Sequence, residues 1–223
     1  MASICSSNDK PSAKEGQPPK QEQAKEQPVN DASKAKGPTG FGPLKLGMTK
    51  EAVEALQPTE GVYLSVPMTP SKFNKYVSPK AGVERFDCSL VTPLSKDALE
   101  TVLVFESGQL TEIFLVLDKS SNMLERVKNQ IVDKYGPGRV EDTRKEKQCI
   151  YKNGANFKIT SGDITTIWVE NFSDAERVET RLSDTSLDAC PSELKYRIEP
   201  TVVRSLTIHR FNSVEQVKSN NLF

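Results

Sequence analysis

Two segments of the chain repeat apolar residues at the three- and four-residue spacing that buries one side of a helix. The first, residues 50–57, follows Thr49, a favourable N-cap residue, and ends at Pro58. The second, residues 121–135, is stopped by the sequence Gly136-Pro137-Gly138. Its apolar stripe consists of Leu124, Val127, Ile131 and Tyr135. The pattern therefore predicts two helices that each place one side on a core.

Elsewhere, runs of apolar and β-branched residues predict antiparallel strands. Residues 101–105 and 110–117 flank Ser107-Gly108, a pair that suits a two-residue hairpin turn. Near the end of the chain, residues 194–198 and 202–210 form another pair of strands, broken at Glu199-Pro200. Two helices, each followed by strands, predict an α+β fold of tandem helix-plus-strands units. We expect an antiparallel β-sheet with two helices packed on one face.

The dipeptides Asn153-Gly154 and Ser161-Gly162 are the strongest local signals, because Gly and Asn accept the positive φ values of hairpin turns. With two-residue turns they predict a meander of residues 147–152, 155–160 and 163–172. Opposed residues share a face, so the register separates two faces. The predicted core face carries Ile150, Phe157, Ile159, Ile164 and Trp168, with the small Ala155 beside the indole. The other face carries Tyr151, Asn156, Lys158, Thr165, Ile167 and Val169.

That second face is more apolar than a solvated surface needs. One interpretation is that a loop or terminal strand covers it. The other is that it receives a protein partner, since exposed apolar patches usually mark interaction sites. The second interpretation makes Tyr151, Ile167 and Val169 partner-binding candidates.

The segment 61–82 is unusual because it combines prolines with aromatic residues. It starts like a strand and then continues through three prolines, as a long loop. Such loops are often functional, and aromatic side chains frequently anchor interfaces. Phe73 and Tyr76 are therefore further partner-binding candidates, and residues 68–82 are a candidate contact loop. The alternative is that both aromatic side chains tuck under the sheet as part of the core.

The first 38 residues contain no Leu and no aromatic residue, and their prolines alternate with Lys, Glu and Gln. Such a segment buries too little apolar surface to offset its ordering entropy. Residues 1–38 are predicted to be a disordered polar tether that proteases cleave first, and residues 39–223 an α+β binding domain. The 30 basic and 30 acidic residues balance, which argues against nucleic-acid binding.

Cysteine usage leaves two compartments open. Cys5, followed by a polar tether and a domain, resembles the mature end of a bacterial lipoprotein, with the lipid on Cys5. The domain would then be periplasmic, anchored to the outer membrane, and would touch the membrane only through that lipid. A Cys88–Cys149 disulfide would stabilise such a domain by about 4 kcal/mol. In a reducing cytoplasm, Cys88, Cys149 and Cys190 would instead be buried thiols.

Motifs for catalysis or cofactors are not found in the sequence. His209 is the only histidine, and without a Cys-x-x-Cys pair it gives no transition-metal ligand set. No G-x-S-x-G nucleophile motif occurs, and Gly37, Gly40 and Gly42 lack the spacing of a phosphate-binding loop. We therefore expect no catalytic residue, no metal and no cofactor.

The sequence Leu46-Gly47-Met48-Thr49-Lys50-Glu51-Ala52-Val53 resembles the start of small bacterial lipoproteins of the SmpA/OmlA type. These are accessory subunits of the outer-membrane β-barrel assembly machine, and their fold is similar to the repeats of the β-lactamase-inhibitor protein. The helix that ends in Lys134-Tyr135-Gly136-Pro137 is similar to the same superfamily. The resemblance implies binding through a sheet face or loops, without catalysis.

These observations predict a non-enzymatic, envelope-associated protein-binding module. Its partner would be envelope machinery, or an enzyme that the module inhibits in the manner of an immunity protein. The alternative is a small soluble hydrolase with an unrecognised site, in which His209 would be the residue to test.

Overall fold

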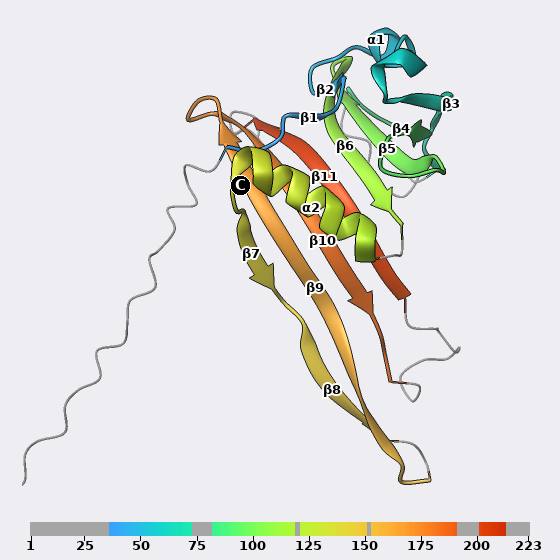
Figure 1. The fold of residues 1–223 in the computed structure, drawn as a ribbon, viewed down its shortest axis with the longest axis vertical. Coiled ribbons are helices and arrows are strands. Elements are labelled where there is room, and N and C mark those ends of the chain that lie inside the picture. Colours follow the sequence, from blue (N-terminus) through green and yellow to red (C-terminus); the bar gives the residue numbers. More distant parts are fainter. Residues whose placement is uncertain (1–35, 73–81, 119–120, 151–152, 191–200, 213–223) are drawn as a thin grey trace, which may run out of the picture. The chain divides into compact units, whose positions relative to one another are not determined.

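An antiparallel sheet of nine strands dominates the computed structural model, which describes residues 36–72, 82–118, 121–150, 153–190 and 201–212 (Figure 1). All of them belong to one compact unit. The strands follow the spatial order β3-β4-β5-β6-β11-β10-β9-β7, and β8 also pairs with β9. Their bounds are β3 Tyr63–Pro70, β4 Val83–Val91, β5 Leu99–Glu106, β6 Gln109–Leu117, β7 Arg139–Asp142, β8 Lys145–Ile150, β9 Asn156–Asn171, β10 Glu176–Leu187 and β11 Thr201–Asn212.

Each of the two α-helices precedes one group of strands. Helix α1 (Lys50–Glu54) comes before β3–β6, and helix α2 (Ser121–Tyr135) comes before β7–β11. The groups join where β6 pairs with β11. A short 3-10 helix (Pro58–Glu60) and a small sheet of β1 (Gly40–Phe41) and β2 (Leu44–Lys45) complete the described elements. The structure is thus mostly β, with two helices on one large sheet.

One face of the sheet carries the main core, and we call it the covered face. Cross-strand pairs trace it through Phe86, Leu103, Ile113, Ile208, Thr180 and Trp168, one residue from each of β4, β5, β6, β11, β10 and β9. Val53 of α1 and Val127 and Ile131 of α2 are buried in the same core. Both helices therefore bury their apolar sides against the covered face, as the sequence predicted. The opposite side of the sheet is the outer face, traced by Asp87, Val102, Phe114, Thr207, Arg181 and Ile167.

Both predicted helices are confirmed, although α1 ends at Glu54 and not at residue 57. The Thr49 side chain accepts a hydrogen bond from Ala52 N at 3.3 Å and so caps α1. Helix α2 has the predicted bounds, and Met123 joins its buried stripe. The hairpin at Ser107-Gly108 is also confirmed, since Glu106 pairs with Gln109 and both turn residues have positive φ.

The described chain is already packed at Gly37, inside the predicted tether. Gly37 N donates to Glu170 Oε2 at 3.2 Å, and Thr180 Oγ1 donates to Pro38 O at 2.9 Å. Gly37 and Pro38 are both buried. Residues 1–35 of the tether lie outside the described residues.

The first turn of the predicted meander has a different register from the one expected. Ile150 lies opposite Asn156 instead of Phe157, because the loop is longer than two residues. Asn153 Oδ1 accepts a hydrogen bond from Ala155 N within this loop. A shift of one residue turns Ile150 away from the core, and its side chain is 67% exposed. The assignment of Ile150 to the core face was therefore wrong.

The predicted turn at Ser161-Gly162 was also wrong, because β9 runs through both residues. Gly162 has φ +127, and a Cβ there would lie 2.8 Å from Thr143 O and from Arg144 Cα. Glycine thus lets the connection between β7 and β8 pass close to β9. Trp168 is fully buried on the covered face, whereas Phe157 and Ile159 belong to a second, smaller core cluster with Cys149 and Cys190.

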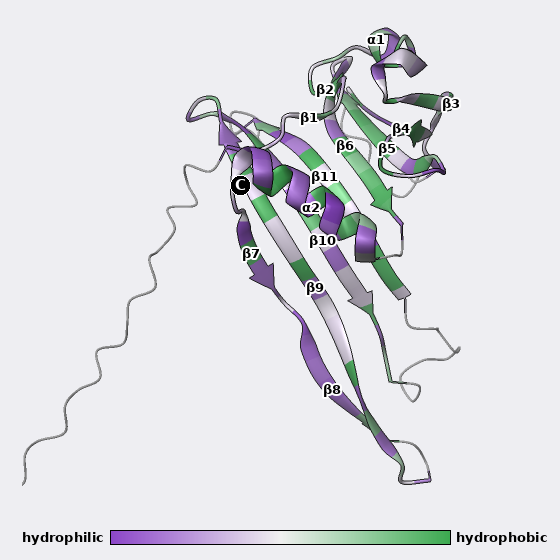
Figure 2. Cartoon of the chain, viewed as in Figure 1, coloured by the Kyte–Doolittle hydropathy of each residue, from purple (hydrophilic) through white to green (hydrophobic). Residues whose placement is uncertain are grey.

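Hydrophobic residues gather on β5 and β6, while hydrophilic residues dominate β7 and β8 (Figure 2). The start of segment 61–82 forms the edge strand β3, which extends to Pro70 and therefore includes part of the predicted contact loop. Residues 73–81 and 191–200, with the predicted strand 194–198, lie outside the described residues.

Candidate partner-binding site

The outer face of the first strand group contains an apolar hollow of about 700 Å³. Val102 on β5 pairs with Phe114 on β6, and both side chains are half-buried. Val66 on the edge strand β3 is 50% exposed. This site, which we call the β3–β6 hollow, is lined by Val66, Pro67, Thr69, Asp87, Cys88, Ser89, Glu100, Thr101, Val102, Phe114 and Val116.

The irregular path of β3 shapes one side of the hollow. Its register against β4 shifts between Leu64 and Val66 and again between Val66 and Thr69. Within this bulged segment Met68 is buried in the core while Val66 points to the outer face. Prolines are tolerated here because an edge strand does not need every N–H. The edge strand therefore supplies apolar surface to the hollow without disturbing the core.

The charges that line the hollow are negative. Asp87 on β4 and Glu100 on β5 lie among the apolar side chains, and no Lys or Arg is among the described lining residues. The Cys88 side chain lies on the covered face, where burial and the nearby Asp87 carboxylate raise the pKa of its thiol to about 12, so it adds no charge to the hollow. The hollow thus combines apolar surface with two carboxylates.

A second group on the outer face consists of side chains that pack against one another. His209 Nδ1 lies 2.7 Å from Glu112 Oε2, and its ring packs edge-on against Phe211 at 4.3 Å between centroids. The Arg177 guanidinium lies 4.9 Å from the centre of the Phe211 ring. Within the described part of the chain, no hydroxyl or thiol group forms a hydrogen bond with His209. The arrangement explains His209 as a residue of β11 that packs between Glu112 and Phe211.

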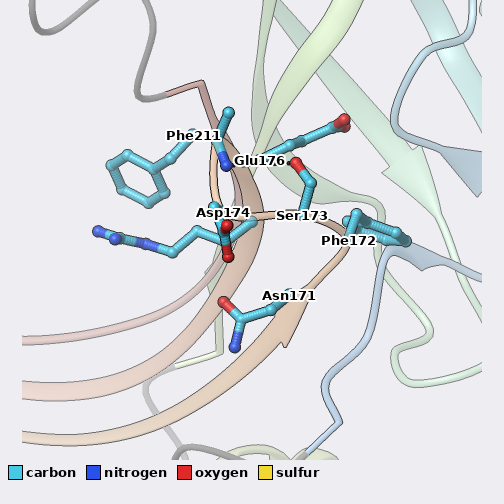
Figure 3. Close-up of a pocket in the computed structure, with 8 residues that line it drawn as sticks. Asn171, Phe172, Ser173, Asp174, Glu176 and Phe211 are labelled. Atoms are coloured by element: carbon cyan, nitrogen blue, oxygen red, sulfur yellow. Dashed lines mark hydrogen bonds between the residues drawn. The ribbon is translucent and has the colours of Figure 1, made fainter.

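The turn between β9 and β10 forms a polar hollow of about 380 Å³ (Figure 3). Most of its lining comes from consecutive residues of one turn, including Ser173, Asp174 and Glu176. Phe172 and Phe211 point to opposite sides of this turn (Figure 3). Because the side chains do not converge on a common point, the hollow is a consequence of the turn's shape.

Of the two interpretations of the second face, the burial of Ile167 favours a face that is covered within the chain. Ile167 lies on the outer face as predicted, but only 2% of it is exposed. Its cross-strand neighbours are Arg139 and Arg181, and the aliphatic stems of such long side chains can cover an adjacent apolar residue. Their charged ends pair with Glu141 and Glu179. Val169 is half-buried on the same face, opposite Glu179.

Several candidate residues lie outside the described residues: Cys5, Phe73, Tyr76 and Tyr151. The apolar residues of the β3–β6 hollow were not singled out from the sequence. A signal was present, since residues 113–117 are apolar without interruption, which places apolar side chains on both faces of β6.

The structure contains a disulfide, but the predicted pairing was wrong. Cys149 on β8 bonds to Cys190, with an S–S distance of 2.01 Å and 5.4 Å between Cα atoms. Cys88 is a free, buried thiol on the covered face of β4. The bond ties the chain that follows β10 to the β8–β9 hairpin.

The described residues hold no group of three or more His, Cys, Asp or Glu side chains arranged for a metal ion. No helix among them is both long and apolar enough to span a membrane. The chain matches no family model, and comparisons with curated proteins and with solved structures give no match.

Proposed function

We propose that the chain is a non-enzymatic protein-binding module whose contact surface is the β3–β6 hollow. The observation that carries the proposal is the hollow itself, with Val66 half-exposed and Val102, Phe114 and Val116 only partly buried. Contiguous apolar surface on an otherwise polar chain marks an interaction site. The proposal keeps the prediction that the chain binds through a sheet face, but the proposed surface lies on the first strand group and not around Ile167.

The proposed location is outside the cytoplasm, in the bacterial envelope. The Cys149–Cys190 disulfide supports it, because structural disulfides persist in oxidising compartments. The resemblance to SmpA/OmlA-type lipoproteins points the same way and extends the proposal to a lipid on Cys5. In the structure the resembling motif forms a turn into a helix, with Gly47 N donating to Leu110 O at 2.7 Å before α1 begins. The partner would be envelope machinery, or an enzyme that the module inhibits.

Site-specific photo-crosslinking in the native host tests the surface. A photoreactive amino acid at Val66 should crosslink to a discrete partner. The matched control is Ile150, which is 67% exposed but lies on β8, away from the hollow in the strand order. Equal crosslinking at both positions, or none at Val66, would contradict the proposal.

The proposed compartment has its own test. Cells are treated with a membrane-permeant alkylating agent before lysis, and the intact protein is weighed by mass spectrometry. If Cys149 and Cys190 form a disulfide in the cell, both sulfurs should stay unalkylated as long as no reductant is added. Alkylation of both cysteines after mild unfolding without reductant would place the chain in a reducing compartment.

A further inference from the structure

We infer that the segment that docks in the β3–β6 hollow is an extended stretch of another protein, carrying apolar side chains flanked by Lys or Arg. This inference rests on the proposed function and adds the chemistry of the partner.

The charges of the hollow select a basic partner. Asp87 and Glu100 both line it, and neither forms an ion pair with a described residue of this chain. Docking an apolar segment over two unpaired carboxylates would remove them from water without compensation. A Lys or Arg on the incoming segment would pair with each carboxylate, whereas an Asp or Glu would be repelled. Charge therefore decides which apolar segments can bind.

The edge strand excludes the commonest alternative, which is strand addition to the sheet. Strand β3 is the sheet edge next to the hollow, and a partner strand needs a regular row of N–H and C=O groups there. Pro67 and Pro70 lack N–H groups, and the register of β3 shifts twice. The partner must therefore dock through its side chains, onto the face and not onto the edge.

The form of the hollow favours a chain segment over a small molecule. A small-molecule site usually encloses most of its ligand. Here Thr69 and Glu100 are exposed and Val66 is half-exposed, so the hollow covers only one side of its occupant. Its lining also spreads over four adjacent strands. An extended segment that places alternate side chains into the hollow fits this surface.

Two fluorescent nonapeptides provide the probe. They share the same apolar residues at alternate positions and carry lysines or glutamates between them. Fluorescence anisotropy on the purified full chain should show that the lysine peptide binds about tenfold more tightly, with a preference that weakens at high salt. In the double variant Asp87→Lys and Glu100→Lys the preference should reverse. The matched control, Glu54→Lys and Glu60→Lys, changes two exposed carboxylates on α1 and the 3-10 helix and should keep the original preference.

The outcomes separate the inference from the proposed function. If the lysine preference survives in the Asp87 and Glu100 variant, or if neither peptide binds, the inferred chemistry of the partner is wrong. In that case a partner crosslinked at Val66 would still support the proposed function. If the Val66 crosslink joins two parts of the same chain, the hollow is filled from within and both proposals fail. Reversal by the variant together with an intermolecular crosslink at Val66 supports both.

Discussion

Adjacent residues on β9 show how one strand serves two faces. Trp168 is fully buried on the covered face, and its Nε1 donates to Gly136 O at 2.9 Å. Ile167 points the other way and is nevertheless only 2% exposed, with an arginine opposite it on each neighbouring strand. Periodicity alone places Trp168 and Ile167 on opposite faces correctly. It does not reveal that long polar side chains can bury an apolar one.

Trp168→Ala should lower the free energy of unfolding by about 3–5 kcal/mol, because it removes a large aromatic from the core. Ile167→Ala should also destabilise the chain, by about 2–4 kcal/mol, since its side chain is equally shielded. Denaturant unfolding measures both. Val66→Ala is the control, because truncating a half-exposed side chain should lower the free energy of unfolding much less. A negligible effect of Ile167→Ala would show that its shielding by the arginines does not persist in solution.

The buried thiol of Cys88 should make stability fall at alkaline pH. Its pKa is raised from 9.0 to about 12 in the folded chain, so between these values the unfolded state loses a proton that the folded state keeps. Stability should therefore be unaffected below about pH 8 and should fall by up to about 1.4 kcal/mol per pH unit above pH 9. Cys88→Ala should remove this part of the alkaline loss. Urea unfolding of the unmodified protein and the variant at pH 8 and pH 10.5 measures this difference. An equal loss of stability in both proteins would contradict the role of the Cys88 thiol.

At the scale of elements, two Ser-Gly pairs show where local sequence stops being sufficient. Ser107-Gly108 forms the predicted hairpin turn, whereas Ser161-Gly162 lies inside β9. Both pairs satisfy the local requirements of a turn. What differs is long-range. Strand β9 pairs with β8 up to Ser161 and with β10 from Gly162 onward, and Gly162 leaves room for the chain at Thr143 and Arg144.

The two helices and the Ser107-Gly108 hairpin were thus predictable from local signals, and elements defined by distant pairing were not. Strand β10 was not predicted, because Glu, Arg, Ser, Asp and Thr fill most of it and Val178, Leu182 and Leu187 are its only aliphatic residues. It becomes a strand because β9 and β11 pair with it on both sides. The candidate site could not be predicted for the same reason, because the β3–β6 hollow depends on how four strands lie side by side.

The Cys149–Cys190 bond should supply much of the stability of the β8–β9 hairpin. It closes a loop of 41 residues, and this loss of freedom in the unfolded chain stabilises the folded state by about 4 kcal/mol. Among the described residues, the cluster that surrounds it contains only Ile159 and the partly buried Phe157 besides the two cysteines. The double variant Cys149→Ala and Cys190→Ala should therefore unfold at clearly lower denaturant than the oxidised protein. Reductant should lower the midpoint of the unmodified protein but leave that of the variant unchanged; a wild-type midpoint insensitive to reductant would contradict this role.

At the scale of the whole molecule, the two strand groups share one core. Cross-strand pairs between β6 and β11 bring Ile113 opposite Ile208 and Leu115 opposite Leu206, and all four side chains are buried. The main core cluster extends without a break from Leu90 on β4 to Trp168 on β9. Since the main core spans both groups, we expect neither to unfold alone.

Two probes, one in each group, can test this cooperativity. Trp168 fluorescence reports on the second group, and alkylation of the buried Cys88 thiol reports on the first, in a Cys5→Ser background that leaves Cys88 as the only free cysteine. Both signals should change at the same urea concentration, as two-state unfolding requires. Ile208→Ala, which removes a buried contact at the junction, should shift both midpoints together by an amount equivalent to about 2–4 kcal/mol. Exposure of Cys88 at lower urea than Trp168 would show that β3–β6 opens independently, and the hollow would then belong to the less stable part of the molecule.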